Sequence, residues 1–169
     1  MGQKLRSNVY EATCDRFASP VIAKFARFEW EIPQLNHETV AYEWIAEHHI
    51  GPEFLGHLVE EGRVIEFVME RIADARHATP HDLPLCRTVL SRLHRLGIVH
   101  GDINKHNSLI RAGIATLIDF DSSWRPASAS EMEKELESLQ QQLEDTSGKG
   151  GTLKYTETFN TDEETSPLS

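Results

Sequence analysis

Four polar residues in one short stretch of the chain could act together in a single reaction. His100 and Asp102 flank Gly101, Asn107 follows Asp102 after five positions, and Asp119 ends an apolar run. Hard cations such as Mg²⁺ prefer oxygen ligands, such as carboxylate and side-chain amide oxygens. Phosphoryl transfer needs such a cation, and also a carboxylate that orients the attacking hydroxyl and accepts its proton. The stretch therefore suits phosphoryl transfer, with Asp102 as the catalytic carboxylate and Asn107 and Asp119 as ligands of Mg²⁺.

The proximity of these side chains depends on a predicted β-hairpin. Ser108 to Ile110 and Ile114 to Ile118 are predicted to be two short strands around a glycine-containing turn. This hairpin would bring Asn107 and Asp119 to neighbouring strand ends. Asp102, on the loop before the hairpin, would then face both of them.

Other interpretations of these residues remain open. Taken singly, each is more often a turn or cap residue than a catalyst, and a motif is a hypothesis until its structural context is known. A zinc site formed by His100, Asp102 and His106 would have the imidazole ligands that zinc favours. No further cluster of His or Cys completes such a site, so the magnesium interpretation is preferred.

The pattern resembles the catalytic loop and metal-binding segment of the protein-kinase-like superfamily, H-x-D-x-x-x-x-N followed by D-F-x. Gly101 stands where protein kinases usually have arginine. This glycine makes the pattern more similar to the aminoglycoside phosphotransferase, choline kinase and RIO-type branches. The resemblance covers roughly residues 9–121. It implies an α+β, two-lobed protein-kinase-like fold in reduced form, with a small β-rich lobe and a truncated helical lobe. It also implies ATP as the phosphoryl donor and Mg²⁺ as the cofactor.

A lysine in the second of two predicted strands, Asn8 to Cys14 and Pro20 to Ala26, fits this resemblance. Lys24 lies in the run Val-Ile-Ala-Lys, which in kinases carries the lysine that holds the α- and β-phosphates of the nucleotide. Taken alone, Lys24 is more simply an exposed residue of an edge strand, because buried lysines are rare. The catalytic stretch favours the phosphate-binding role.

A helix is predicted from Asn36 to about His48, since an apolar stripe repeats at helical spacing there. In kinases this helix carries a glutamate that pairs with the strand lysine. Glu38 fits that role best, with Glu43 in reserve, although a glutamate in a first helical turn also commonly compensates the helix dipole. Strands at 55–59 and 63–69 around a turn at 60–62 follow. The predicted order is β-β-α-β-β.

The resemblance also implies an adenine site. Its backbone contacts would come from the segment that joins the lobes, and its apolar walls from three side chains, all of which are equally consistent with ordinary core positions. The implied residues are Met69, Glu70 and Ile72 for the joining segment, and Val9, Ile22 and Leu109 for the walls.

Two helices are predicted in the second half. Thr79 to Asp82 has a capping threonine, a proline at the first helical position and a carboxylate three residues on, and the helix it opens ends at Gly97. Ser130 with Glu133 predicts a capping box for an acidic helix at residues 131–145. The leucine seam of this helix is expected to dock on the larger lobe, and its acidic face is a possible site for a protein partner.

Composition excludes several classes of function. The 169 residues correspond to about one domain, and the net charge of −10 leaves no basic patch for nucleic acid. No apolar run reaches transmembrane length, and no secretory signal is visible. Two cysteines are too few for a disulfide framework. We therefore expect an intracellular, cytoplasmic protein that binds neither nucleic acid nor membrane.

These expectations combine into one architecture. Residues 1–72 are predicted to form a kinase-like N-terminal lobe and hinge, and residues 73–146 a reduced C-terminal lobe with the catalytic loop and acidic helix. Residues 147–169 are rich in Gly, Thr, Ser and Glu, and are predicted to be a disordered acidic tail.

The predicted function is ATP-dependent transfer of a phosphoryl group to a hydroxyl of a protein or small molecule. The alternative is a catalytically weak or inactive pseudokinase that serves as a nucleotide- or protein-binding module. Two motifs of the kinase family are absent from the sequence, and their absence favours the pseudokinase alternative. Gly2 is the only glycine before Gly51, so a glycine-rich phosphate loop is missing, and no A-P-E segment follows Asp119. Lys24 also lies where the first strand of the lobe should already have passed, so the chain is expected either to begin late or to have dispensed with that strand.

Overall fold

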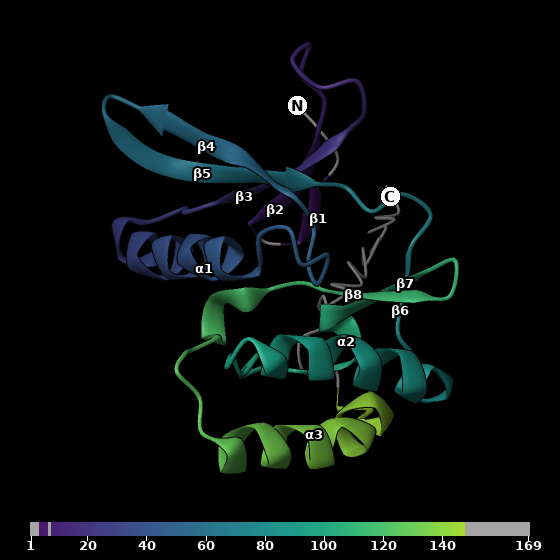
Figure 1. Cartoon of the computed structure of the whole chain (residues 1–169). Helices are drawn as coiled ribbons and strands as arrows, with labels where there is room; N and C mark the ends of the chain where they lie inside the picture. Colours follow the sequence, from purple (N-terminus) through teal and green to yellow (C-terminus); the bar gives the residue numbers. More distant parts are fainter. Residues whose placement is uncertain (1–3, 7, 148–169) are drawn as a thin grey trace, which may run out of the picture.

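The first half of the chain forms an antiparallel sheet of five strands (Figure 1). The structure is a computed structural model that describes residues 4–6 and 8–147. Across the sheet the order is β1 (Lys4–Arg6), β2 (Val9–Ala12), β3 (Val21–Phe25), β5 (Arg63–Glu70) and β4 (Phe54–Glu60).

Strand β1 corrects the expectation that the first strand is missing. It pairs with β2, with Lys4 opposite Tyr10 and Arg6 opposite Val9, and its register shifts between these two pairs. Three residues are too few to show the alternation of apolar and polar side chains that identifies a strand in a sequence. The other four strands were predicted to within one or two residues.

The hairpin between β4 and β5 was predicted correctly. Glu60 pairs with Arg63, so the turn has two residues. Both turn residues have positive φ, 49° at Glu61 and 78° at Gly62. Such turns match the right-handed twist of the flanking strands.

Helix α1 (Ile32–Ile45) follows a 3₁₀ turn at Glu29–Glu31 and lies beneath the five-stranded sheet (Figure 1). It begins one turn before the predicted start at Asn36. A proline in its first turn suits that position, because the first N–H groups of a helix have no intrahelical partner. The earlier start places Glu38 in the body of the helix, where it is buried, rather than in the first turn.

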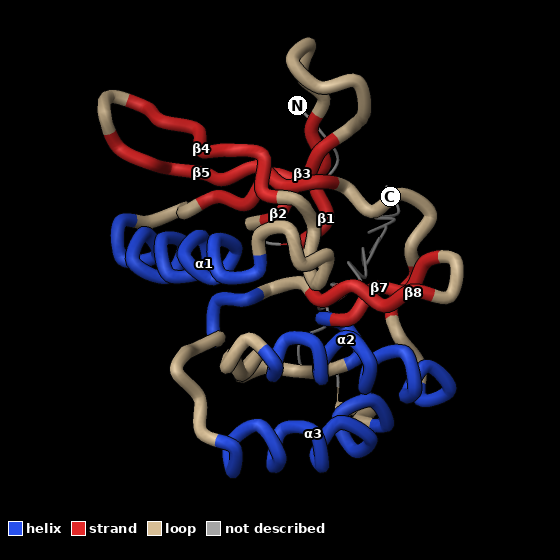
Figure 2. Tube along the Cα trace, viewed as in Figure 1, coloured by secondary structure: helices blue, strands red, loops and turns tan. Residues whose placement is uncertain are grey.

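The second half of the chain contributes a smaller sheet and two helices. The sheet has the order β6 (Arg76–His77), β7 (Ser108–Arg111) and β8 (Ile114–Leu117), and its β7–β8 hairpin is the one predicted from the sequence. In Figure 2 this sheet lies between the five-stranded sheet and helix α2 (Leu83–Arg95), with α3 (Ala129–Glu144) beyond α2.

Capping boxes precede α2 and begin α3. Thr79 was predicted as a capping residue, and with Asp82 it forms a capping box that opens a 3₁₀ turn at Pro80–Asp82 directly before α2. The second prediction was wrong by two residues, because Ser128 and Glu131 form the box of α3 in place of Ser130 and Glu133. The two pairs have the same spacing, and the extended backbone of Ser128 selects between them.

One apolar cluster among the described residues joins both sheets and all three helices, so the molecule has a common core. Leu139 and Leu143 of α3 are almost completely buried, as expected for docking of the leucine seam. Burial of each such side chain stabilises the fold by about 1.5–3 kcal/mol. The cluster includes Tyr42 and Ile45 of α1, Phe67 and Met69 of β5, Leu90 and Leu93 of α2, Leu117 of β8, and Phe120.

The mixed α+β class is confirmed. Apart from Ser147, the predicted disordered tail at 147–169 lies outside the described residues. Within the part of the chain that the structure describes, no helix is long and apolar enough to cross a bilayer.

Candidate active site

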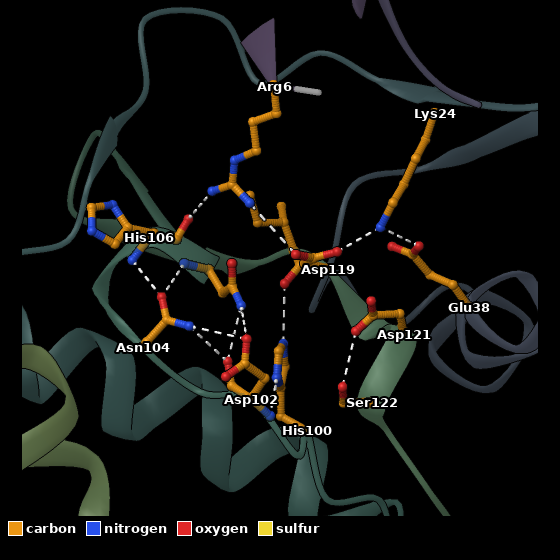
Figure 3. A network of polar contacts seen from close by, with 12 residues as sticks. Arg6, Lys24, Glu38, His100, Asp102, Asn104, His106, Asp119, Asp121 and Ser122 are labelled. Atoms are coloured by element: carbon orange, nitrogen blue, oxygen red, sulfur yellow. Dashed lines mark hydrogen bonds and ion pairs between the residues drawn. The ribbon is translucent and has the colours of Figure 1, made fainter. Parts of the chain in front are cut away.

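An ion-paired cluster joins β3, α1 and the end of β8 (Figure 3). The Nζ atom of Lys24 lies 2.5 Å from Glu38 Oε2 and 2.5 Å from Asp119 Oδ1. Lys24 is 9% exposed and Glu38 only 1%. A buried ammonium needs partners, and these two carboxylates provide them. Lys24 is therefore not an exposed edge-strand residue, and its partner is Glu38 rather than the exposed Glu43.

Burial and charge act in opposite directions on these groups. Burial lowers the pKa of Lys24, but Glu38 and Asp119 raise it more, so the pKa lies above its ordinary value. Burial raises the pKa of Glu38 to about 7, although the charge of Lys24 opposes this rise. Burial also raises the pKa of Asp119, but Lys24 and Arg6 outweigh it and the pKa is lowered. Lys24 and Asp119 are therefore both charged at neutral pH.

Arg6 on β1 is a member of this cluster that the sequence interpretation missed. Its guanidinium lies 3.5 Å from Asp119 Oδ2 and donates a hydrogen bond of 3.2 Å to the carbonyl oxygen of His106. Figure 3 shows Arg6 and Lys24 reaching Asp119 from different sides. No motif pointed to Arg6, because the contact joins segments 113 residues apart.

The loop before β7 holds Asp102 through two asparagines. Asn107 Nδ2 donates to both the backbone oxygen and Oδ2 of Asp102, at 3.0 Å each, and Asn104 Nδ2 donates to the same two atoms. The side-chain oxygen of Asn104 in turn accepts from the backbone N–H groups of His106 and Asn107. The sequence interpretation did not assign this positioning role to Asn104.

Asn107 and Asp119 meet one condition for holding Mg²⁺. Asn107 is 1% exposed, and its amide oxygen Oδ1 is buried without a hydrogen-bond partner. A buried acceptor of this kind normally has a partner, and a cation would satisfy it. The N–H of Ile118, next to Asp119, donates to the backbone oxygen of Asn107, so the two predicted ligands lie on adjacent backbone. Asp119 also has left-handed backbone torsion angles, φ 68° and ψ 64°.

His100 packs inside the loop rather than binding a metal. It is fully buried, its Nε2 lies 3.1 Å from the oxygen of Ile118, and its ring is 5.1 Å from that of Phe120. Burial lowers the pKa of His100, which favours the neutral ring. The alternative zinc ligands His100, Asp102 and His106 are not brought together, since no three His, Cys, Asp or Glu side chains among the described residues are grouped closely enough to hold a metal ion.

Glu135 of α3 is a third contributor that the sequence interpretation missed, after Arg6 and Asn104. Its carboxylate accepts from the backbone N–H groups of His100 and Gly101, at 3.1 and 2.8 Å, and lies 2.7 Å from His94 Nε2. Burial raises the pKa of Glu135, but these donors outweigh burial and lower it. The helix expected to dock by its leucines therefore also anchors the loop that carries Asp102.

A cleft of about 360 Å³ opens beside the ion-paired cluster. All the residues predicted to bind nucleotide line it, whereas Asp102 and Asn107 lie in the loop beyond Asp119. The predicted lining residues are Val9, Ile22, Lys24, Glu38, Met69, Glu70, Ile72 and Leu109. A smaller hollow of about 140 Å³ shares Arg6, Lys24, Glu38 and Asp119 with this cleft.

A mostly apolar cleft that ends at paired lysine and carboxylate groups, with a further carboxylate nearby, has the parts required for phosphoryl transfer. Comparison with curated proteins gave no significant match. A family model does match, over residues 75–160, and its description is the lipopolysaccharide kinase (Kdo/WaaP) family. Because this match spans more than half of the chain, including residues 100–119, the chain belongs to the lipopolysaccharide kinase (Kdo/WaaP) family and is a kinase of the protein-kinase-like superfamily.

Proposed function

We propose that this kinase transfers the γ-phosphoryl group of ATP to a hydroxyl of a sugar-containing acceptor. The observation that carries the proposal is the cluster of Lys24, Glu38 and Asp119 at the inner end of the larger cleft, beside the loop of Asp102. The sugar class of the acceptor rests on the name of the matching family. A protein hydroxyl remains the competing acceptor.

The donor site follows from the cleft. Val9, Ile22 and Leu109 provide apolar walls suited to a flat base, and the backbone of Met69 to Ile72 provides hydrogen-bonding groups at its edge. Lys24, held by Glu38, would bind the α- and β-phosphates. Its buried ion pair keeps the ammonium in place before the nucleotide arrives.

Asn107 and Asp119 would hold Mg²⁺, which is consistent with the unpaired amide oxygen and the lowered pKa of the carboxyl group. A magnesium ion bound there would neutralise charge on the phosphates. Asp102 would accept the proton of the acceptor hydroxyl as its oxygen forms a bond to the γ-phosphorus. The bond from that phosphorus to the β–γ bridging oxygen then breaks, and ADP leaves.

The same proposal includes a reduced two-lobed fold. Residues 1–72 would form the small lobe and hinge, and residues 73–146 the larger lobe. Gly101 supports kinship with the aminoglycoside phosphotransferase, choline kinase and RIO-type branches. The acidic face of α3 would bind a protein partner, because Glu133, Glu137 and Glu144 are exposed, whereas the buried residues of the helix are Glu135, Leu139 and Leu143.

Two isosteric variants test the proposed roles. Asp102→Asn keeps the size of the side chain but removes the proton acceptor, so ATP·Mg²⁺ should still bind while transfer falls by about 10²–10⁴-fold. Asp119→Asn removes the anionic metal ligand, so Mg²⁺-dependent binding of ATP should itself weaken. The measurements are calorimetric ATP titrations at varied Mg²⁺ and single-turnover release of ADP.

Asp15→Asn, on an exposed loop, is the matched control and should change neither quantity. Acceptors are compared by supplying a lipopolysaccharide core oligosaccharide or a serine-containing peptide. Transfer to the peptide alone would refute the sugar class. No transfer to any acceptor, with unchanged ATP binding in both variants, would refute the enzyme and favour the pseudokinase alternative.

A further inference from the structure

Among the described residues, no glycine lines the larger cleft or the smaller hollow beside it. Strand β1 ends at Arg6 and β2 begins at Val9, so only Ser7 and Asn8 connect them, and neither is glycine. Backbone N–H groups approach phosphates most closely where the residues are glycine. A cationic side chain at this end of the cleft would supply the phosphate contacts that a glycine-rich loop supplies in protein kinases.

Arg6 occupies the place where such a group is needed. It lines both the larger cleft and the smaller hollow, and about a quarter of its side chain is exposed. It lies across the cluster from Lys24 and bonds to the carbonyl oxygen of His106 in the catalytic loop (Figure 3). The Arg6 side chain thus connects β1 of the five-stranded sheet to the loop that carries Asp102.

We propose that Arg6 is the phosphate clamp of this kinase, binding the terminal phosphate of the nucleotide in place of a glycine-rich loop. This inference rests on the proposed use of ATP. It gives Arg6 a role in binding that no motif in the sequence indicates.

The present contacts of Arg6 suit an exchange in which its guanidinium leaves Asp119 and binds a phosphate. Its distance to Asp119 Oδ2, 3.5 Å, is long for a charge-assisted hydrogen bond, for which about 2.7–2.9 Å is typical. Lys24 already pairs with the other oxygen of Asp119 at 2.5 Å. A phosphate offers the guanidinium two oxygens in the planar geometry that it matches best. Movement of Arg6 to the phosphate would also free Asp119 Oδ2 for a cation.

The test compares nucleotides that differ only in their phosphates. Dissociation constants of ATP, ADP and adenosine are measured with Mg²⁺ for the parent chain and for Arg6→Gln. The variant should bind ATP about 10- to 100-fold more weakly, the range expected for loss of hydrogen bonds to a charged group. The loss should be smaller for ADP, and absent for adenosine.

Two further variants sharpen the result. Lys4→Gln removes the same charge from the same strand, at an exposed position that does not line the cleft, and should bind ATP like the parent. Arg6→Lys keeps the charge but loses the planar fork, so its affinity should be intermediate. Melting temperatures of all variants show whether each one is folded.

The inference is overturned if Arg6→Gln weakens the binding of ATP no more than Lys4→Gln does. It is also overturned if Arg6→Gln weakens the binding of adenosine as much as the binding of ATP. Its failure is distinct from failure of the proposed function. A parent that binds and turns over ATP without help from Arg6 would retain its function and refute the clamp. A parent whose ATP binding depends on Arg6 but that transfers no phosphoryl group would retain the clamp and refute the transfer.

Discussion

Gly101 illustrates how one residue of the catalytic loop is determined by its surroundings. Its φ is +83°, and a Cβ atom placed on it would lie 2.1 Å from the backbone oxygen of Ser122. The larger side chain that protein kinases usually have at this place cannot be accommodated. The glycine therefore reflects the close approach of the segment after Asp119, which packs directly on the loop.

We predict that Gly101→Ala destabilises the fold and disturbs catalysis. The positive φ alone corresponds to about 1–3 kcal/mol of strain for a residue with a side chain, and the overlap with Ser122 adds to it. Gly113→Ala is the matched control, because Gly113 has a similar φ of +75° but no atom within 4 Å of the added Cβ. Urea unfolding should therefore show a larger loss for Gly101→Ala, and equal losses would contradict the steric explanation.

At the scale of elements, helix α3 links the core to the loop that carries Asp102. Leu139 and Leu143 fix the helix in the core. Glu135, on the same helix, accepts hydrogen bonds from the backbone N–H groups of His100 and Gly101. The spacing of four residues from Glu135 to Leu139 places both on one face of the helix. Docking of the leucines therefore aims the carboxylate at the loop.

We predict that Glu135→Gln reduces stability by about 1–3 kcal/mol, because buried backbone donors lose a charged acceptor. Turnover should fall more than ATP affinity does, since the loop carries Asp102 whereas the cleft is formed elsewhere. Glu137→Gln, on an exposed position of the same helix, is the control and should change neither. Chemical unfolding together with separate kcat and Kd measurements gives the readout.

The same variant should alter the response to acid. The folded pKa of Glu135 is below its ordinary value of 4.5, so its stabilising contribution is present above that pH and is lost as pH falls through the folded pKa. Glu135→Gln should lose less stability than the parent on acidification over this window. If both proteins lose the same amount of stability on acidification, the contacts assigned to Glu135 are contradicted.

At the scale of the whole molecule, the two sheets are held in a fixed relation by α1. His37 Nε2 lies 2.6 Å from the oxygen of Ser123, and Gln34 donates to Asp121 at 2.8 Å. The N–H of Leu117 also donates to the oxygen of Ile50. These bonds join α1, and the loop that follows it, to the strand and segment that carry Asp119, so the Lys24–Asp119 contact is organised before any ligand binds.

We predict that a buried carboxyl group outside the active site makes the stability of the whole fold depend on pH. Glu66 on β5 is 4% exposed, and burial raises its pKa from 4.5 to about 7. Its stabilising contribution is therefore fully present below about pH 4.5 and is lost as pH rises through 7. Glu66→Gln, which imitates the protonated form, should melt a few degrees above the parent at pH 8 and at the same temperature near pH 4.5.

The exposed Glu43→Gln of α1 controls for the change in net charge and should melt like the parent at both values of pH. The measurement is thermal unfolding across the pH range. A constant difference between Glu66→Gln and the parent at every pH would show that Glu66 does not titrate in this window.

The sequence by itself determined the parts of the site that are close along the chain. The hairpin that follows Asn107 and ends before Asp119 is local, and its turn and strand signals are contained in a few residues. The lysine strand and the glutamate helix were likewise recognisable, although the start of the helix was displaced by one turn. Residue type and short-range spacing are sufficient where a contact needs only one turn or one hairpin.

Only the tertiary structure determined the contacts between distant segments. Arg6 meets Asp119 across 113 residues, and Glu135 reaches Gly101 across 34. Neither pair has a spacing or periodicity that marks it in the sequence. Such contacts depend on how the common core packs the sheets and helices together, because loop-closure entropy opposes each contact and many buried side chains must overcome it jointly.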